Sequence, residues 1–214
     1  MALTTAAAVK RRLPGFDAAD TDSDTLIAEL ISAADEVIAT WCGYPPTSAG
    51  AAPDLESQTY TRYYGGRPEH FGIGADGSID SRVLVLDVLP VSSIPSIHDD
   101  SQWSYGSAEL VDSGDYTLEG ETGRVYLDPD ATQGAFSRVS RAVKAIYVAG
   151  WATVPDQVAE AALQLIAHWF QLPSRQGRSS LSKAGGSTSW RTEGMPESVQ
   201  ELLSPYRLPR VLCP

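Results

Sequence analysis

Apolar residues recur at helical spacing in residues 23–42. They form two adjacent stripes, Leu26, Leu30, Val37 and Trp41 in the first and Ile27, Ile31, Ala34 and Ile38 in the second. The acidic residues of the segment lie off this face, and Gly43 follows its last turn. The pattern predicts an amphipathic helix that ends at the glycine.

A second segment, residues 155–172, is apolar around most of a helical circumference. Its two stripes are Val158, Ala162, Leu165, Trp169 and Leu172, and Ala159, Leu163, Ile166 and Phe170. A helix so broadly apolar must be covered on more than one side, either between a sheet and another helix or between neighbouring subunits. We therefore expect a packing helix whose contacts include Val158, Leu165, Trp169 and Phe170.

Between these helices the apolar period changes from helical to alternating. Residues 57–150 contain short apolar or alternating runs that are separated by turn sequences such as DSGD and EGETG. This pattern predicts short antiparallel strands in a small sheet or sandwich. Short helices are expected at residues 4–12 and from about Pro196 to Pro205.

The predicted fold class is α+β, with N-terminal helices, an antiparallel β block, a long packing helix and a short terminal helix. In this scheme residues 1–172 form one domain. Residues 173–194 are rich in serine and glycine, which predicts a flexible basic arm. Residues 195–214 then form a C-terminal helix and tail.

Charge is distributed unevenly along the chain, whose net charge is −11. Residues 1–170 hold 10 basic and 24 acidic residues, whereas residues 171–214 hold 6 basic and 3 acidic residues. The acidic body argues against sequence-specific DNA binding, because phosphate contacts supply most nucleic-acid affinity. A basic end is typical of an interaction segment. Its residues of the types favoured at interfaces are Trp190, Met195, Tyr206, Arg207 and Arg210.

The sequence offers little catalytic or metal-binding chemistry. His70, His98 and His168 are scattered, and no Gly-x-Ser-x-Gly nucleophile motif is present. Residues 180–183 match Ser-x-x-Lys, but the companion motifs of penicillin-recognising enzymes are missing. We therefore expect no enzymatic activity, no cofactor and no metal. No run approaches the roughly 18 apolar residues of a membrane span, and the N-terminus lacks the charge order of a secretory signal, so we expect a protein made in a cytoplasm without a membrane partner.

Six segments, in this order, make the chain similar to one protein family: TAAAVKRRL, DTLIAELISAADEVIATWCG, YTRYYGG, LVLDVLPVSSIPSIHDD, GDYTLEGETGRVYL and IYVAGWATVPDQVAEAALQLIAHWF. They cover about residues 4–172. In the last segment a strand, Gly-Trp, Val-Pro and a long helix follow one another. This order resembles the head–tail connector (head-completion adaptor) proteins of long-tailed phages and of phage-like gene transfer agents.

The resemblance implies a structural protein of the virion neck. Members of the family form a ring, typically of twelve subunits, beneath the portal, where they extend the DNA channel and offer a platform to the next neck or tail component. The implied partners are the portal protein, a downstream tail-completion or neck protein and further copies of the chain. Packaged DNA would pass without specific binding, since an acidic wall repels phosphate. The chain would be made in the bacterial host cytoplasm, and its basic C-terminal segment would dock on the portal.

Three other interpretations stay open. The chain could be a tail terminator or another neck ring, although those proteins usually lack the join of strand, Gly-Trp, Val-Pro and helix. It could be a carbohydrate- or ligand-binding β domain in which Trp103, Tyr105 and the acidic turns line a site. It could also be a hydrolase that uses His168 as a base, which would require a nucleophile or bound substrate within reach.

Overall fold

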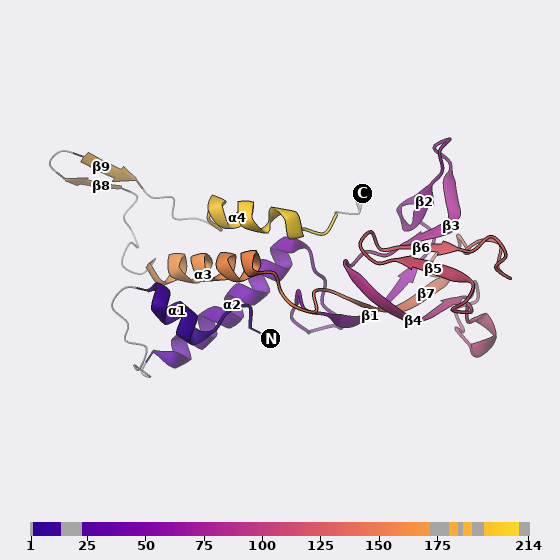
Figure 1. Ribbon diagram of the computed structural model, residues 1–214, viewed down its shortest axis with the longest axis horizontal. Coiled ribbons are helices and arrows are strands. Elements are labelled where there is room, and N and C mark those ends of the chain that lie inside the picture. The colour runs from indigo at the N-terminus through magenta and orange to yellow at the C-terminus, as the bar shows by residue number, and fades with distance from the viewer. Residues whose placement is uncertain (1, 14–22, 172–179, 184–185, 190–194, 210–214) are drawn as a thin grey trace. The chain divides into compact units, whose positions relative to one another are not determined.

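The structure is a computed structural model, and it describes residues 2–13, 23–171, 180–183, 186–189 and 195–209. The chain divides into two compact units. The helical unit comprises residues 1–42 and 154–207, and the β unit comprises residues 43–153 and 208–214. Figure 1 shows the helices of the first unit and the sheets of the second. The predicted α+β class, with helices at the N-terminal side and a C-terminal helix, is confirmed.

The helical unit is built from both ends of the chain. Its helices are α1 (Ala6–Arg12), α2 (Asp24–Cys42), α3 (Asp156–Gln171) and α4 (Glu197–Leu203), and the 3-10 turn η4 (Ser204–Tyr206) follows α4. The side-chain oxygen of Thr5 accepts a hydrogen bond from the backbone N–H of Ala8 at 3.2 Å, which caps α1. Strands β8 (Ser180–Lys183) and β9 (Gly186–Ser189) pair in an antiparallel hairpin within the serine- and glycine-rich segment.

Helix α3 is the centre of the helical unit, since it packs against α1, α2 and α4. The side chains with no exposed area come from three helices: Ile27, Ala34, Ile38 and Ala39 of α2, Val158, Ala161, Ala162, Leu165 and Ile166 of α3, and Val199 and Leu203 of α4. Other helices therefore cover the broad apolar face of α3 on several sides. Among the described residues, no helix combines the length and apolar character that a bilayer crossing requires.

The β unit contains two antiparallel sheets. The first has the order β1-β7-β4, with β1 (Gln58–Tyr64), β7 (Val143–Ala149) and β4 (Val91–Asp99). The second has the order β2-β3-β6-β5, with β2 (Phe71–Ile73), β3 (Ile79–Val85), β6 (Arg124–Leu127) and β5 (Tyr116–Glu119). Alternate residues of the central strand β7 are buried, namely Val143, Ala145, Tyr147 and Ala149. This period of two is the one that predicts a strand with one covered face.

Connections between the sheets place particular edge strands together. The 3-10 turn η1 (Pro68–His70) leads from β1 into β2, so these two edges lie at one lateral side of the β unit. At the other side, the Tyr116 hydroxyl of β5 donates a hydrogen bond to the backbone carbonyl of Ile94 in β4, at 3.5 Å. The unit therefore has a β1–β2 side and a β4–β5 side.

At two places in the β unit, local sequence interrupts a run that would otherwise form a strand. The apolar run from Arg82 to Ile94 is broken into β3 and β4, and the Leu89–Pro90 peptide bond between them is cis. Between β4 and β5, the 3-10 turn η2 (Ser107–Glu109) is followed by a single bridge between Leu110 and His98, where the alternating pattern led us to expect a short strand. Proline and a short polar turn interrupt the ladder at these points.

The Gly-Trp sequence after β7 is fixed within the β unit. Gly150 has a φ of 108°, and a Cβ atom at this position would lie 2.4 Å from the carbonyl oxygen of Glu56. The indole N–H of Trp151 donates to the Tyr44 hydroxyl at 3.0 Å, and that hydroxyl donates to the Leu89 carbonyl at 2.7 Å. Only glycine meets both the backbone and the space requirement at position 150.

Candidate assembly interface

The C-terminal segment for which the sequence predicts partner contacts is part of the helical unit. Val199 and Leu203 of α4 have no exposed area, and α4 packs against α3. Full burial of such side chains contributes roughly 1.5–3 kcal/mol each. The segment is therefore fixed by its own core contacts, and the polar and aromatic residues at the two ends of α4 are held in place.

Two of the predicted interface residues follow α4 and contact other helices. The guanidinium carbon of Arg207 lies 4.6 Å from the ring centroid of Trp41, the penultimate residue of α2. The Tyr206 hydroxyl donates a hydrogen bond to Oε1 of Gln157 in α3 at 2.8 Å. A cation–π contact and a side-chain hydrogen bond thus connect the chain after α4 with both long helices.

A third predicted residue, Met195, lies on the other side of α4. It is half-buried, and its carbonyl accepts a hydrogen bond from the Gln200 side chain at 2.8 Å. The 7 residues of α4 separate it from Tyr206 and Arg207. The remaining two predictions, Trp190 and Arg210, lie outside the described residues.

An open groove lies beside α4. Its volume is about 420 Å³, and it is lined by Gln157, Gln164, Ser198, Glu201, Leu202 and Pro205. The Ser198 hydroxyl donates a hydrogen bond to the Gln164 side-chain oxygen at 3.3 Å. Four of the six lining residues carry polar side chains, and Leu202 and Pro205 supply apolar area between them.

Helix α2 carries an apolar stripe that the helical unit leaves partly uncovered. The stripe containing Ile27, Ile31 and Ile38 is buried, whereas Leu26 is 49% exposed and Val37 is 40% exposed. Leu30 and Trp41, on the same stripe as Leu26, are half-buried. Both stripes are equally apolar in sequence, so the structure decides which of them belongs to the core. An exposed stripe that ends at Trp41, beneath Arg207, is a candidate protein contact.

The four packing residues predicted for α3 divide into two pairs. Val158 and Leu165 have no exposed area and belong to the core, whereas Trp169 and Phe170 at the end of the helix are half-buried. His168 beside them is also half-buried. Within the described residues, no group of three histidine, cysteine, aspartate or glutamate side chains is placed to hold a metal ion.

A family comparison decides the class of protein. The model of one family, described as "Head completion protein", matches residues 2–208. The chain belongs to the head completion protein family. The predicted recognition is confirmed, and with it a structural role in the connection between head and tail.

Solved structures share the fold of this head completion protein. One similar chain comes from a structure described as "Virion of native gene transfer agent (GTA) particle", with a TM-score of 0.54, 18% identity, and coverage of 97% of this chain and 91% of that one. Another comes from "Neck of native GTA particle computed with C12 symmetry", with a TM-score of 0.50, 17% identity, and coverage of 88% and 84%. No curated protein matches the chain by sequence.

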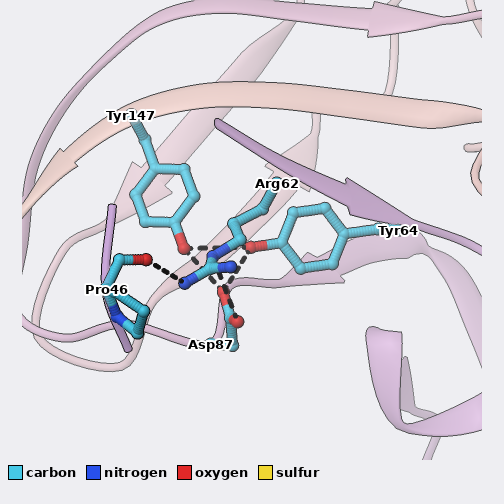
Figure 2. A network of polar contacts seen from close by, with 5 residues as sticks. All are labelled: Pro46, Arg62, Tyr64, Asp87 and Tyr147. Atoms are coloured by element: carbon cyan, nitrogen blue, oxygen red, sulfur yellow. Dashed lines mark hydrogen bonds and ion pairs between the residues drawn. The ribbon is translucent and has the colours of Figure 1, made fainter. Parts of the chain in front are cut away.

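A polar cluster of the head completion protein surrounds Asp87 in the β unit, and Figure 2 shows it. The hydroxyls of Tyr147 and Tyr64 lie 2.6 and 2.7 Å from the same carboxylate oxygen, Oδ1. Each phenol has one proton, so both donate to Asp87, and the 3.1 Å between the two phenol oxygens follows from their shared acceptor. Arg62 approaches Oδ2 at 3.8 Å and donates to the Pro46 carbonyl at 3.4 Å.

The two phenols of this cluster are buried, and the cluster holds strands of the β unit together. Burial is the main cause that raises the pKa of Tyr64 and Tyr147, and the Asp87 charge raises the pKa of both phenols further. Both hydroxyls therefore stay protonated and donate continuously. The cluster ties β1 and β7 to the segment before β4. Asp87 within the apolar run LVLDVLP was the sequence signal for it, because a carboxylate among apolar residues needs partners.

The aromatic and acidic residues that could line a site in a carbohydrate- or ligand-binding β domain form hydrogen bonds within the β unit. The Trp103 indole donates to the Ser140 carbonyl at 3.0 Å, and the Tyr105 hydroxyl donates to the Arg141 carbonyl at 2.5 Å. The carboxylates of Asp112 and Asp115 accept backbone N–H groups of neighbouring turns, at 2.8 and 3.1 Å. These contacts are those of turn-forming residues.

Proposed function

We propose that this head completion protein is a non-enzymatic subunit of a neck ring that docks beneath the portal, extends the DNA channel and receives the next neck or tail component. The observation that carries the proposal is the family match over residues 2–208. A similar fold in a neck with C12 symmetry supports a ring of twelve copies.

The portal contact is proposed for the segment around α4. Tyr206 and Arg207 are anchored on α3 and α2, and Met195 lies at the start of the same segment. Trp190 and Arg210, outside the described residues, extend the proposed contact at both ends. Arginine and aromatic side chains that are held before binding lose little entropy on docking, which favours them as anchors.

The partly exposed stripe of α2 is the second surface proposed for assembly. Leu26 and Val37 present apolar area on the stripe that ends at Trp41, and burying such area stabilises a contact by roughly 25 cal/mol per Å². Trp169 and Phe170, half-buried at the end of α3, are candidates for the same kind of contact. Both surfaces belong to the helical unit, which is thus the proposed docking module.

Passage of DNA without specific binding is part of the proposal. The net charge of −11 opposes the approach of phosphate to most of the surface. A channel wall of this sign would keep packaged DNA from adhering while it moves. The proposed non-enzymatic role agrees with the use of the Asp87 cluster in fixing strands.

The test is the association of the purified chain with purified portal protein, measured by native mass spectrometry and negative-stain microscopy. Twelve copies per portal ring are expected. Arg207→Glu should weaken the association at least tenfold, since it reverses the charge at the anchored contact. The matched control is Arg11→Glu, an exposed charge reversal on α1.

Removal of residues 210–214 tests the end of the chain without touching α4, whose Val199 and Leu203 are needed for the core. A truncated chain that folds and binds portal as the intact chain does would remove Arg210 from the proposal. An intact chain that binds no portal protein and forms no ring would overturn the proposed function.

A further inference from the structure

Three residues with a strained backbone lie in two neighbouring loops of the β unit. They are Trp103, Tyr105 and Arg141, whose φ angles are 63°, 49° and 60°. Residues that carry a side chain keep such conformations only where the surrounding contacts enforce them. Trp103 and Tyr105 follow β4, and Arg141 precedes β7, the strand that lies next to β4 in the sheet. The contacts of these two loops therefore fix their shape.

The loop after β4 is folded around the carboxylate of Asp100. This carboxylate accepts hydrogen bonds from the backbone N–H groups of Gln102, Ser104 and Tyr105 at 2.6–2.9 Å. It also accepts a hydrogen bond from the Ser104 hydroxyl at 2.7 Å. The loop held in this way displays Trp103, which is 57% exposed. A large aromatic side chain is thus presented to solvent from a fixed backbone.

The loop before β7 is fixed against the end of β1. The N–H of Gly66 donates a hydrogen bond to the Arg138 carbonyl at 2.9 Å. A Cβ atom on Gly65, whose φ is 105°, would lie 2.1 Å from the Val139 carbonyl oxygen. The two segments approach so closely that only glycine fits at position 65. The side chains that this loop carries therefore start from positions that are set before any partner binds.

Cations and aromatic rings alternate where the two loops meet the sheet. Tyr63 of β1 and Lys144 of β7 are directly opposite one another, so their side chains lie on the same face. The guanidinium carbon of Arg141 lies 4.5 Å from the Tyr63 ring centroid, and the Lys144 ammonium lies 5.4 Å from that of Tyr105. The two tyrosine rings are 5.5 Å apart. Two cations and two rings therefore form one continuous layer.

Two further arginines extend this layer. A pocket of about 120 Å³ is lined by Gly66, Arg67, Pro68, Phe71 and Arg138. Arg138 and Arg141 are exposed, and neither forms an ion pair within the described residues. Their charges are thus available to a partner. The surface called basic–aromatic below is formed by Tyr63, Arg67, Trp103, Arg138, Arg141 and Lys144.

Carboxylates lie beside the same end of β4. Asp99 accepts hydrogen bonds from the Gln133 side chain and from the backbone N–H of Ser137, the latter at 2.7 Å. The backbone N–H of Thr132 donates to the Asp115 carboxylate at 3.1 Å. A long polyanion such as DNA would meet both signs of charge here, which opposes the series of phosphate contacts that its binding needs. A protein segment can instead place its carboxylates over the arginines alone.

We propose that the basic–aromatic surface binds an acidic segment of the next neck or tail component. The inference rests on the proposed function and deepens it, because it assigns a surface to the partner that the neck ring receives. Arginine binds carboxylates through paired N–H···O hydrogen bonds. Tryptophan, tyrosine and arginine are also the residue types that dominate interface energetics. The partner segment is expected to carry several carboxylates and one apolar side chain that packs on Trp103.

The character of this surface fits an incoming partner better than a neighbouring copy. Contacts between subunits that stay together are more apolar than contacts between partners that form separately. The exposed stripe of α2, with Leu26 and Val37, has the apolar character of a permanent contact. The basic–aromatic surface holds four cations instead, and charge of one sign speeds the encounter with a partner of the other sign. It therefore suits a component that arrives at a ring already formed.

The experiment mixes heads that contain the full chain or a variant with purified tails of the same particle, and joined particles are counted by negative-stain microscopy. Arg138→Glu/Arg141→Glu should lower joining at least tenfold and leave association with purified portal protein unchanged. The carbonyls of both residues make the loop hydrogen bonds, so the substitutions leave these bonds intact. Arg138→Lys/Arg141→Lys keeps the charge and should retain most of the joining. The matched control is Arg11→Glu/Arg124→Glu, which changes net charge equally at exposed arginines outside this surface.

The outcomes separate this contact from the proposed function. Normal joining by Arg138→Glu/Arg141→Glu would overturn the inference and leave the proposed function intact. Loss of ring formation or of portal association in this variant would make the surface a contact with another copy or with the portal, which also overturns the inference. So would wild-type binding to a DNA duplex that the variant loses, since the surface would then be a nucleic-acid site. A wild type that forms no ring and binds no portal protein would overturn both proposals.

Discussion

The guanidinium of Arg207 lies over the indole of Trp41, with 4.6 Å between the guanidinium carbon and the ring centroid. The contact joins the chain after α4 to the last turn of α2. Both residues also border surfaces proposed for assembly, the partly exposed stripe of α2 and the segment that ends the helical unit. One pair of side chains therefore contributes to the stability of the unit and to the shape of its proposed docking surface.

Arg207→Ala should lower the free energy of unfolding by about 0.5–1 kcal/mol, the value of a cation–π contact at an exposed site. Urea denaturation of the full chain measures the change. Arg207→Lys keeps the charge and should recover part of it. If Arg207→Ala had no effect on stability in a Trp41→Leu background, the two residues would be coupled as proposed. A full effect of Arg207→Ala in the absence of the indole would contradict the coupling.

Tyr147→Phe should destabilise the protein by roughly 1–3 kcal/mol, the cost of removing one partner from a buried hydrogen bond. The Tyr147 side chain has no exposed area, and its hydroxyl donates to Asp87 at 2.6 Å. The matched control is Tyr63→Phe, on the same sheet, where the ring is 37% exposed. Thermal and urea unfolding of both variants should separate them. Equal stability of the two variants would contradict the role assigned to the Asp87 cluster.

The Cys42 thiol should be unreactive in the folded protein. It is 1% exposed, and burial raises its pKa to about 12, although the nearby Arg207 charge acts in the opposite direction. At pH 8 only about one thiol in ten thousand would be ionised, and the thiolate is the reactive form. Labelling with a thiol reagent should be negligible in native Cys213→Ser protein and complete after unfolding in guanidinium. Fast labelling of the native protein would contradict the burial of Cys42.

Asp100 should make stability depend on pH below about 4. Hydrogen bonds from Ser104 and from the loop backbone lower the pKa of Asp100 to about 2, against an ordinary value near 3.9 in an unfolded chain. Its contribution is therefore fully present above the unfolded value and is lost as the pH falls through the folded value. The stability difference between wild type and Asp100→Asn should be constant from pH 5 to 7 and should shrink toward pH 2. A stability difference that stayed constant down to pH 2 would contradict the role assigned to the Asp100 carboxylate.

Helices were predicted well from sequence because their signals are local. The apolar period of residues 23–42 and 155–172 and the proline or glycine at their ends are enough to locate α2 and α3. The sequence could not show which of the two apolar stripes of α2 is buried, because this depends on which stripe α3 covers. The contact between Arg207 and Trp41 was also beyond sequence, since it joins residues from opposite ends of the chain.

The β unit shows the same division between local and distant signals. Alternation predicted β1 and β7, but the short strand β2 at Phe71–Ile73 has too few residues to show a period. The loop around Asp100 has a local signal, an aspartate followed by small polar residues. Its role as the support of an exposed tryptophan depends on Ser140 and Arg141, which only the fold brings near. The placement of Trp103 and Tyr105 against Ser140 and Arg141 is therefore a product of tertiary structure.

Gly150→Ala should be among the most disruptive single substitutions in the β unit. An alanine Cβ at this position would lie 2.4 Å from the Glu56 carbonyl oxygen, and the backbone φ is 108°. Two costs add, the strain of a positive φ, of order 1–3 kcal/mol, and the displacement of the backbone at Glu56. Gly77→Ala is the matched control, because Gly77 has a φ of 79° but nothing within 4 Å of a Cβ atom. The difference in unfolding free energy between the two variants therefore isolates the close approach of Gly150 to Glu56. Equal stability of the two variants would show that position 150 tolerates a side chain.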